Sequence, residues 1–243
     1  MDNKTVNFTI DGVDMQGKPG QTILEAADAA GIYIPRLCAM KGLSPNGSCR
    51  VCTVMVNSRP QTACTFPIAE GMDVENDTEK LRTMRRDIID MLFVEGNHFC
   101  MFCEKSGNCE LQALAYRFGI CAPKYPYLFP KCGPVDASHP DVFIDRNRCI
   151  LCGRCVSASI EQDGKNVFGF AARGPHKRVT VNSDSGLDKT DLAVADKAAA
   201  SCPVGAIVRK RVGFAAPVGQ RAYDCAPIGS EIEAAKPSSG TNQ

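Results

Sequence analysis

Hydrophobic and polar positions alternate near the start of the chain, which is the pattern of a strand with one buried face. The alternation covers residues 4–10 (KTVNFTI), and Asp11-Gly12 follows as a typical two-residue hairpin turn. Residues 13–16 can return as the second strand. The pattern therefore predicts an N-terminal β-hairpin.

A helical period replaces the alternation after the hairpin. Thr22 and Glu25 form a capping box, and apolar residues recur at helical spacing until Gly31 ends the helix. Residues 53–57 and 71–75 have the pattern of two further short strands. A hairpin, a helix, a loop of cysteines and further strands follow one another in the order of a β-grasp ferredoxin domain.

The most regular helical period covers residues 78–95, and Gly96-Asn97 is a stop signal behind it. The apolar residues predicted to share one face of this helix are Leu81, Met84, Ile88, Met91, Leu92 and Val94. Another helix is predicted for residues 110–118 (ELQALAYRF), directly after a group of cysteines. Together with the strands, these helices predict an α+β fold.

Cysteine is the unusual feature of the composition, with 14 residues in a chain of 243. The N-terminal sequence lacks the apolar stretch and cleavage site of a secretory signal, so we expect a cytoplasmic protein with reduced, metal-binding cysteines. The 28 basic and 27 acidic residues balance, and no basic stripe predicts a nucleic-acid partner. No apolar run has the length of a membrane span.

The first group of cysteines has the pattern Cys38-x10-Cys49-x2-Cys52-x11-Cys64. Four thiolates from one irregular stretch are the number that a 2Fe–2S cluster needs. A structural zinc site is the alternative, but zinc sites usually draw two C-x2-C pairs from two knuckles, and this group has one pair. The spacing therefore favours a cluster over zinc.

A phosphate-binding motif is nearly complete in the same region. Gly12-x4-Gly17-Lys18 matches the phosphate loop except at its last position, where Pro19 replaces the magnesium-binding Ser or Thr. We interpret Gly17, Pro19 and Gly20 as turn residues that break the chain before the helix. No G-x-G-x-x-G motif predicts nucleotide binding elsewhere.

The second group is His98-x-Cys100-x2-Cys103-x5-Cys109. Three cysteines cannot supply all four ligands of a 4Fe–4S cluster, so the adjacent imidazole is the natural fourth ligand. A lone histidine is more often a surface or packing residue, and the three cysteines beside it reverse that expectation. A neutral imidazole in place of a thiolate should raise the cluster's reduction potential.

The third group is Cys149-x2-Cys152-x2-Cys155, followed by Cys202-Pro203 after a gap of 46 residues. Three close cysteines and a remote Cys-Pro are the arrangement of bacterial 4Fe–4S ferredoxins. A two-cluster ferredoxin would have another cysteine where this chain has Ser159. One of the two clusters is therefore expected to be missing, with a hairpin and a helix in its place.

In this order the three motifs resemble one family over about residues 1–210: the N-terminal part of the large iron–sulfur subunit of respiratory complex I and its relatives in hydrogenases. Within it, the chain is most similar to the small diaphorase subunit of the cytoplasmic NAD-reducing nickel–iron hydrogenase. The chain ends soon after Cys202, and His98-x-Cys100 is shorter than the H-x3-C of the complex I subunit. The segment GNHFC…CEKSGNCELQALAY also has the hydrogenase form.

The resemblance implies one 2Fe–2S cluster and two 4Fe–4S clusters. The implied ligands are Cys38, Cys49, Cys52 and Cys64 for the 2Fe–2S cluster; His98, Cys100, Cys103 and Cys109 for one 4Fe–4S cluster; and Cys149, Cys152, Cys155 and Cys202 for the other.

The resemblance also implies an electron-transfer subunit without a catalytic site of its own. Its partners would be the small and large subunits of a nickel–iron hydrogenase and a flavin- and NAD-binding diaphorase subunit. By analogy, the 2Fe–2S cluster would face the flavin subunit, the Cys149 cluster would lie next, and the His98 cluster would face the hydrogenase. The alternatives are a homologous subunit of a complex I or NAD-dependent formate dehydrogenase assembly, or a colourless zinc-rich structural protein.

Cys121, Cys132 and Cys225 belong to none of the three groups, and we expect them to be free. The expected organisation is a 2Fe–2S ferredoxin domain (1–77), a His/Cys 4Fe–4S segment (78–118), a linker (119–139), a bacterial-ferredoxin-like 4Fe–4S domain (140–225) and a flexible tail (226–243).

Overall fold

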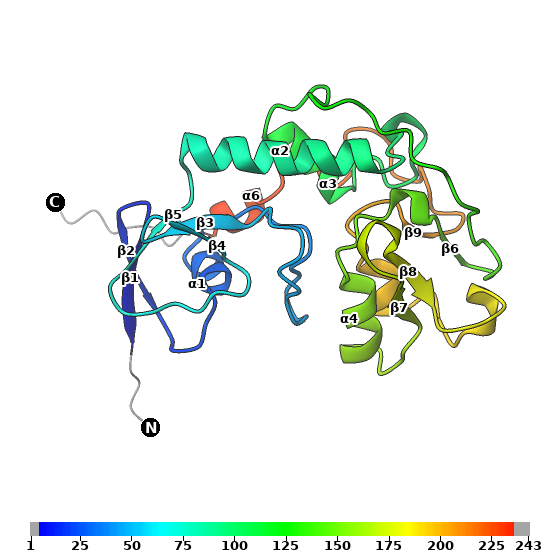
Figure 1. Ribbon diagram of the computed structural model, residues 1–243, viewed down its shortest axis with the longest axis horizontal. Helices are drawn as coiled ribbons and strands as arrows, with labels where there is room; N and C mark the ends of the chain where they lie inside the picture. The colour runs from blue at the N-terminus through cyan, green and yellow to red at the C-terminus, as the bar shows by residue number, and fades with distance from the viewer. Residues whose placement is uncertain (1–4, 236–243) are drawn as a thin grey trace.

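The computed structural model describes residues 5–235. Its N-terminal sheet and its C-terminal strands lie at opposite ends of the molecule (Figure 1). The long helix α2 (Glu79–Glu95) extends between them. No helix among the described residues is long and apolar enough to cross a membrane.

The N-terminal sheet has five strands in the order β2-β1-β5-β3-β4. Strands β1 and β5 are parallel, and the other neighbouring pairs are antiparallel. The sequence prediction missed only β4 in this sheet. The strands are β1 (Val6–Ile10), β2 (Val13–Gly17), β3 (Thr53–Val56), β4 (Arg59–Thr62) and β5 (Met72–Glu75).

Helix α1 (Ile23–Ala29) begins at the predicted capping box. The Glu25 backbone N–H donates to Oγ1 of Thr22 at 3.2 Å, and the Glu25 carboxylate accepts from the Thr22 N–H at 2.8 Å. Ile23 is fully buried in the core that the helix and the sheet share. The incomplete phosphate-loop motif ends in a turn before the helix, as predicted, and in this turn the Gln21 N–H donates to the Lys18 carbonyl.

Helix α2 matches the predicted helix, but its buried face differs from the predicted one. Met91 is exposed, whereas the cationic Arg85 is turned inward and is only 2% exposed. The guanidinium of Arg85 donates to the carbonyl oxygens of Thr53 and Asn76, each at 2.8 Å. These bonds hold the two terminal nitrogens of the buried cation and fix α2 against the N-terminal domain.

The predicted second helix is α3 (Glu110–Arg117), and a short 3-10 turn, η1 (Cys100–Phe102), precedes it. This region contains no strand and shares its core with other parts of the chain. Buried residues of that core come from α3, the 2Fe–2S-type domain, α2 and the C-terminal part: Tyr33, Leu37, Val51, Ile89, Leu111, Leu114, Val204 and Ile228.

The C-terminal domain has two small antiparallel sheets and two short helices. β6 (Val142–Ile144) pairs with β9 (Ile207–Arg209), and α4 (Arg154–Glu161) begins between Cys152 and Cys155 of the third cysteine group. The insert forms the expected hairpin and helix: β7 (Phe168–Ala171), β8 (Arg178–Val181) and α5 (Lys197–Ala200), with 3-10 turns η3 (Gly174–His176) and η4 (Leu187–Lys189). A further 3-10 turn, η2 (Arg146–Arg148), lies directly before Cys149.

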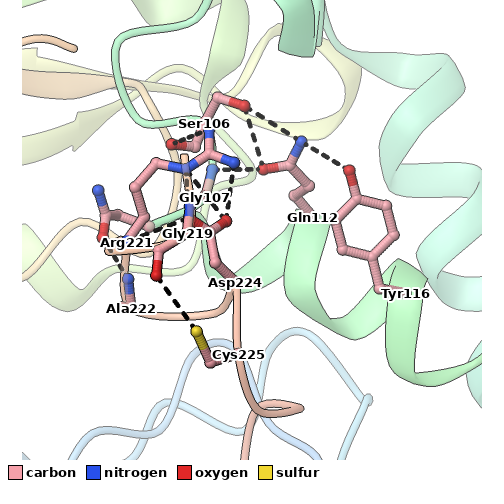
Figure 2. Close-up of polar contacts among 10 residues, drawn as sticks. Ser106, Gly107, Gln112, Tyr116, Gly219, Arg221, Ala222, Asp224 and Cys225 are labelled. Carbon is pink, nitrogen blue, oxygen red and sulfur yellow. Dashed lines mark hydrogen bonds and ion pairs between the residues drawn. The ribbon is translucent and has the colours of Figure 1, made fainter. Parts of the chain in front are cut away.

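The chain after β9 returns to the loop at Ser106 and Gly107, which lies between Cys103 and Cys109 in the sequence (Figure 2). The Tyr223 N–H donates to the Gly107 carbonyl at 3.0 Å, and the Ala222 N–H donates to the Asn108 side chain at 2.9 Å. We call residues 210–229 the C-terminal strap. It ends at α6 (Ser230–Glu233), so the expected flexible tail contains a short helix, directly before which Ile228 is buried, while residues 236–243 lie outside the described part.

Candidate metal centres

The first cysteine group lies at one end of the N-terminal sheet. Cys38 and Cys49 come from the loop behind α1, whereas Cys52 precedes β3 and Cys64 follows β4. The Cys38 N–H donates to the sulfur of Cys49 at 3.4 Å. The pKa of Cys38 is lowered because the thiols of Cys49 and Cys64 donate hydrogen bonds to its sulfur. The thiol of Cys64 also contacts the sulfur of Cys52, so the four sulfurs form one contiguous set.

A buried cation lies behind this set. Burial lowers the pKa of Arg85 to about 10, and the negative charge of ionised Cys52 and Asp77 opposes that shift. Within residues 5–235, no carboxylate lies at ion-pair distance from the Arg85 guanidinium. An anionic iron–sulfur cluster would supply the counter-charge that this arginine lacks.

The second group converges on one cavity between α2 and α3. His98, Cys100, Cys103 and Cys109 all line it, together with Arg148 and apolar side chains. Nε2 of His98 is buried and has no hydrogen-bond partner among the described residues. Burial and nearby Arg148 lower the pKa of His98 to about 4, so the imidazole is neutral and can bind metal at neutral pH.

The third group lines another apolar cavity, between β6, β9 and α4. Cys149, Cys152, Cys155 and Cys202 all contribute to its wall. Leu151 has a φ of 54°, which wraps the chain so that its N–H donates to the Cys149 sulfur at 3.4 Å. Burial raises the pKa of Cys152 to about 12, and bound metal would offset this by stabilising the thiolate.

The donor sets have the chemistry of cluster ligands. In the described part of the chain, no group of three or more His, Cys, Asp or Glu side chains is arranged to hold one metal ion. Each of the two cavities has four soft donors spread around an apolar wall. That chemistry fits iron–sulfur clusters, which bind thiolates and occasionally imidazole.

The remaining cysteines lie outside the three sets. Cys121, Cys132 and Cys225 are exposed, and the Cys225 thiol donates to the Gly219 carbonyl at 3.2 Å (Figure 2). Ser159 is fully buried, and its hydroxyl accepts a hydrogen bond from the Val167 N–H at 3.0 Å. The position of the absent ferredoxin cysteine thus supports the β7 hairpin.

Two arginine–glutamate pairs between the second and third groups were missed by the sequence analysis. Arg148 binds Glu104 at 2.8 Å, and Arg154 binds Glu110 at 2.6 Å. Arg148 also donates to the sulfur of Cys103 at 3.7 Å. A signal was present in the sequence, because each arginine directly precedes a cysteine and each glutamate directly follows one.

Comparisons with known proteins divide the chain in the same order. Residues 3–79 match the 2Fe–2S iron–sulfur cluster binding domain, and residues 85–123 match the NADH-ubiquinone oxidoreductase-G iron–sulfur binding region. Residues 142–208 match the 4Fe–4S single cluster domain. Fold and sites together define an iron–sulfur electron-transfer protein, and the predicted α+β arrangement of ferredoxin-type domains is confirmed.

Two relatives match this chain over nearly its whole length, and both belong to NAD-reducing hydrogenases. The chain is 38% identical over 221 residues to the gamma subunit of the NAD-reducing hydrogenase HoxS of Cupriavidus necator, covering 90% of this chain and 94% of that protein. It is also similar to the crystal structure of an NAD+-reducing NiFe hydrogenase in the hydrogen-reduced state, with a TM-score of 0.89 and 46% identity over 93% of this chain and 98% of that one.

Larger relatives match this chain over only about a quarter to a third of their own length. The alpha subunit of the NADPH-Fe(3+) oxidoreductase of Geobacter sulfurreducens is 34% identical over 86% of this chain, which covers 24% of that protein. The mitochondrial NADH-ubiquinone oxidoreductase 78 kDa subunit of Candida albicans is 32% identical over 87% of this chain and 29% of that protein. The chain belongs to the family of the gamma subunit of NAD-reducing hydrogenases, as the sequence resemblance predicted.

Proposed function

We propose that this chain relays electrons one at a time through one 2Fe–2S and two 4Fe–4S clusters. The observation that carries the proposal is the grouping of twelve soft donors into three closed sets of four. The proposed ligands are Cys38, Cys49, Cys52 and Cys64 (2Fe–2S); His98, Cys100, Cys103 and Cys109 (4Fe–4S); and Cys149, Cys152, Cys155 and Cys202 (4Fe–4S).

The clusters would supply reversible one-electron chemistry, and the protein would hold and shield them. Apolar walls keep water from the two cavities, and the neutral His98 imidazole is ready to bind iron without losing a proton. The Leu151 N–H and the Arg148 guanidinium donate to cysteine sulfurs. Donors of this kind stabilise negative charge on sulfur and raise a cluster's potential.

The partner proposal rests on the family and on one surface. Electrons would enter from a nickel–iron hydrogenase module and leave to a flavin- and NAD-binding diaphorase subunit. Phe99, Met101 and Phe102 beside the second cavity are 63%, 86% and 75% exposed. An apolar surface of this kind next to a redox site is typical of a protein interface, and we place the hydrogenase module there.

We also propose that the protein works in the cytoplasm. None of the fourteen cysteines, all of which lie in the described part of the chain, forms a disulfide bond. A reducing cytoplasm would keep them available as ligands during cluster assembly.

Co-purification tests the partner proposal. An affinity-tagged chain produced in its own cells should retain a nickel-containing subunit and a flavin subunit. Met101→Asp should release the nickel subunit and leave the flavin subunit bound, whereas Val13→Asp, at another exposed apolar position, should release neither. Recovery of the chain with a complex I or formate dehydrogenase assembly instead would contradict the proposal.

A further inference from the structure

One arginine contacts all three metal-binding segments. Arg154 begins α4 between Cys152 and Cys155, and it is only 4% exposed. Its two terminal nitrogens donate to the two carboxylate oxygens of Glu110 at 2.6 and 2.7 Å. One of these nitrogens, Nη2, also donates to the Ala39 carbonyl oxygen at 2.9 Å.

The partners of Arg154 directly follow proposed ligands of the other two clusters. Glu110 comes after Cys109 of the second set, and Ala39 comes after Cys38 of the first set. Arg154 itself lies inside the third set. The three cluster-binding loops therefore meet at the Arg154 guanidinium, and we call this meeting point the junction.

Two neighbouring hydrogen bonds reinforce the junction without adding charge. The Asn46 side chain, from the loop of the first set, donates to the Cys152 carbonyl at 3.2 Å. The Glu110 N–H donates to the carbonyl of Pro203, which follows Cys202 of the third set, at 2.8 Å. Each bond joins segments that are distant in the sequence.

The chemistry of the junction favours a fixed geometry. The Arg154 side chain is 4% exposed and that of Glu110 is 23% exposed, so the guanidinium and the carboxylate pair largely out of water. A planar guanidinium in a two-point bond with a carboxylate allows little rotation. Loss of the arginine would leave the Glu110 carboxylate partly buried without its cation.

We propose that Arg154 is a positioning residue that sets the distances and relative orientations of the three clusters. Electron transfer between clusters slows steeply with distance, so this junction would control the rate of the relay. The inference rests on the cluster assignment proposed above. Nε of Arg154 is buried and has no partner within residues 5–235, which leaves the terminal nitrogens as the groups that hold the junction.

The test uses the full chain with its clusters, prepared anaerobically as wild type and as Arg154→Met, Arg154→Lys and Arg36→Met. Arg36 is the matched control because it makes a similar two-point bond to Asp28, at 2.7 and 2.8 Å, inside one domain. The readouts are iron content, the reduction potential of each cluster, and the magnetic interaction between pairs of reduced clusters measured by pulsed electron paramagnetic resonance (EPR).

We expect Arg154→Met to retain iron but to change the magnetic interaction between clusters and to lower the potential of the Cys149 cluster. Arg154→Lys should restore the potential but not the interaction, because an ammonium keeps the charge and lacks the two-point bond. Arg36→Met should change neither. An unchanged interaction in an iron-replete Arg154→Met protein would overturn the proposal.

If Arg154→Met loses iron, Glu110→Gln decides the question, since it keeps the side-chain shape and removes the charge pair. A changed interaction in that variant supports the junction, and an unchanged one overturns it. Failure of the cluster assignment is a distinct result, because it would appear in the iron content and spectra of the wild-type chain.

Discussion

The N-terminal domain and the His/Cys segment hold their metal sites in different ways. The domain has a five-stranded sheet, and its hydrophobic core comes from residues 6–74, with Cys52 and Cys64 inside it. The segment between α2 and α3 has no strand, and the core beside it is formed by side chains from the N-terminal domain, the helices and the C-terminal part of the chain. The first site is built on a self-contained fold, whereas the second is held by its neighbours and, we infer, by its cluster.

Removal of iron should produce the largest difference in stability between the two regions. Under anaerobic chelation, amide hydrogens of residues 97–109 should lose most of their exchange protection, because few backbone hydrogen bonds hold that segment. Strands β1 and β5 should change by less than about tenfold, or ~1.4 kcal/mol, because their backbone pairing and most of their apolar core remain when the metal is removed. Equal loss of protection in both regions would contradict the comparison.

His98→Cys should have the next largest effect, and it should be confined to the second site. A thiolate adds negative charge, so the potential of that cluster should fall by an amount on the order of 100 mV. The other two clusters should keep their potentials in an EPR-monitored redox titration. Identical titrations of variant and wild type would remove His98 from the ligands.

Arg85→Met should affect only the first site. Loss of the buried cation should lower the 2Fe–2S potential by tens of millivolts, since ~59 mV is a tenfold change for one electron. The carbonyls of Thr53 and Asn76 would lose their donor, which should cost about 1–3 kcal/mol of stability. Arg82→Met, one turn away and half-exposed, is the control and should leave the 2Fe–2S potential in place.

Arg221→Ala should have the smallest effect. Its guanidinium binds Asp224 at 2.7 Å and the Ser106 carbonyl at 3.4 Å, which ties the C-terminal strap to the second loop (Figure 2). We expect a loss of about 0.5–1.5 kcal/mol, measured as faster exchange in residues 105–109. Arg211→Ala removes an exposed pair with Asp141 and should leave that exchange as it is.

The sequence predicted regular elements best where local signals were strong. The Thr22 capping box, the Asp11-Gly12 turn and the period of α2 each depend on neighbouring residues, and each was confirmed. Strand β4 (RPQT) was missed because its side chains are mostly exposed and it contains a proline. Pairing with β3 stabilises it, which is a tertiary effect.

The burial of the Arg85 side chain and the junction at Arg154 could not be predicted from the periodicity of hydrophobic residues. Both are charged residues whose burial depends on carbonyls and carboxylates that are distant in the sequence. The three groups of cysteines were recognised from their spacing, because ferredoxin loops bring close ligands together locally, whereas the four-ligand sets were implied by the family resemblance. The burial of Ile228 before α6, and the hydrogen bond that its carbonyl accepts from Arg117, depend on distant contacts that no local pattern encodes.

The iron content tests the central claim most directly. One 2Fe–2S and two 4Fe–4S clusters require about ten irons and about ten acid-labile sulfides per anaerobically prepared chain. A further cluster on Cys121, Cys132 and Cys225 would raise the count to about fourteen irons by the same arithmetic. We predict about ten irons with three distinct EPR signals on reduction. A count near fourteen, or colourless protein that binds zinc, would contradict the account.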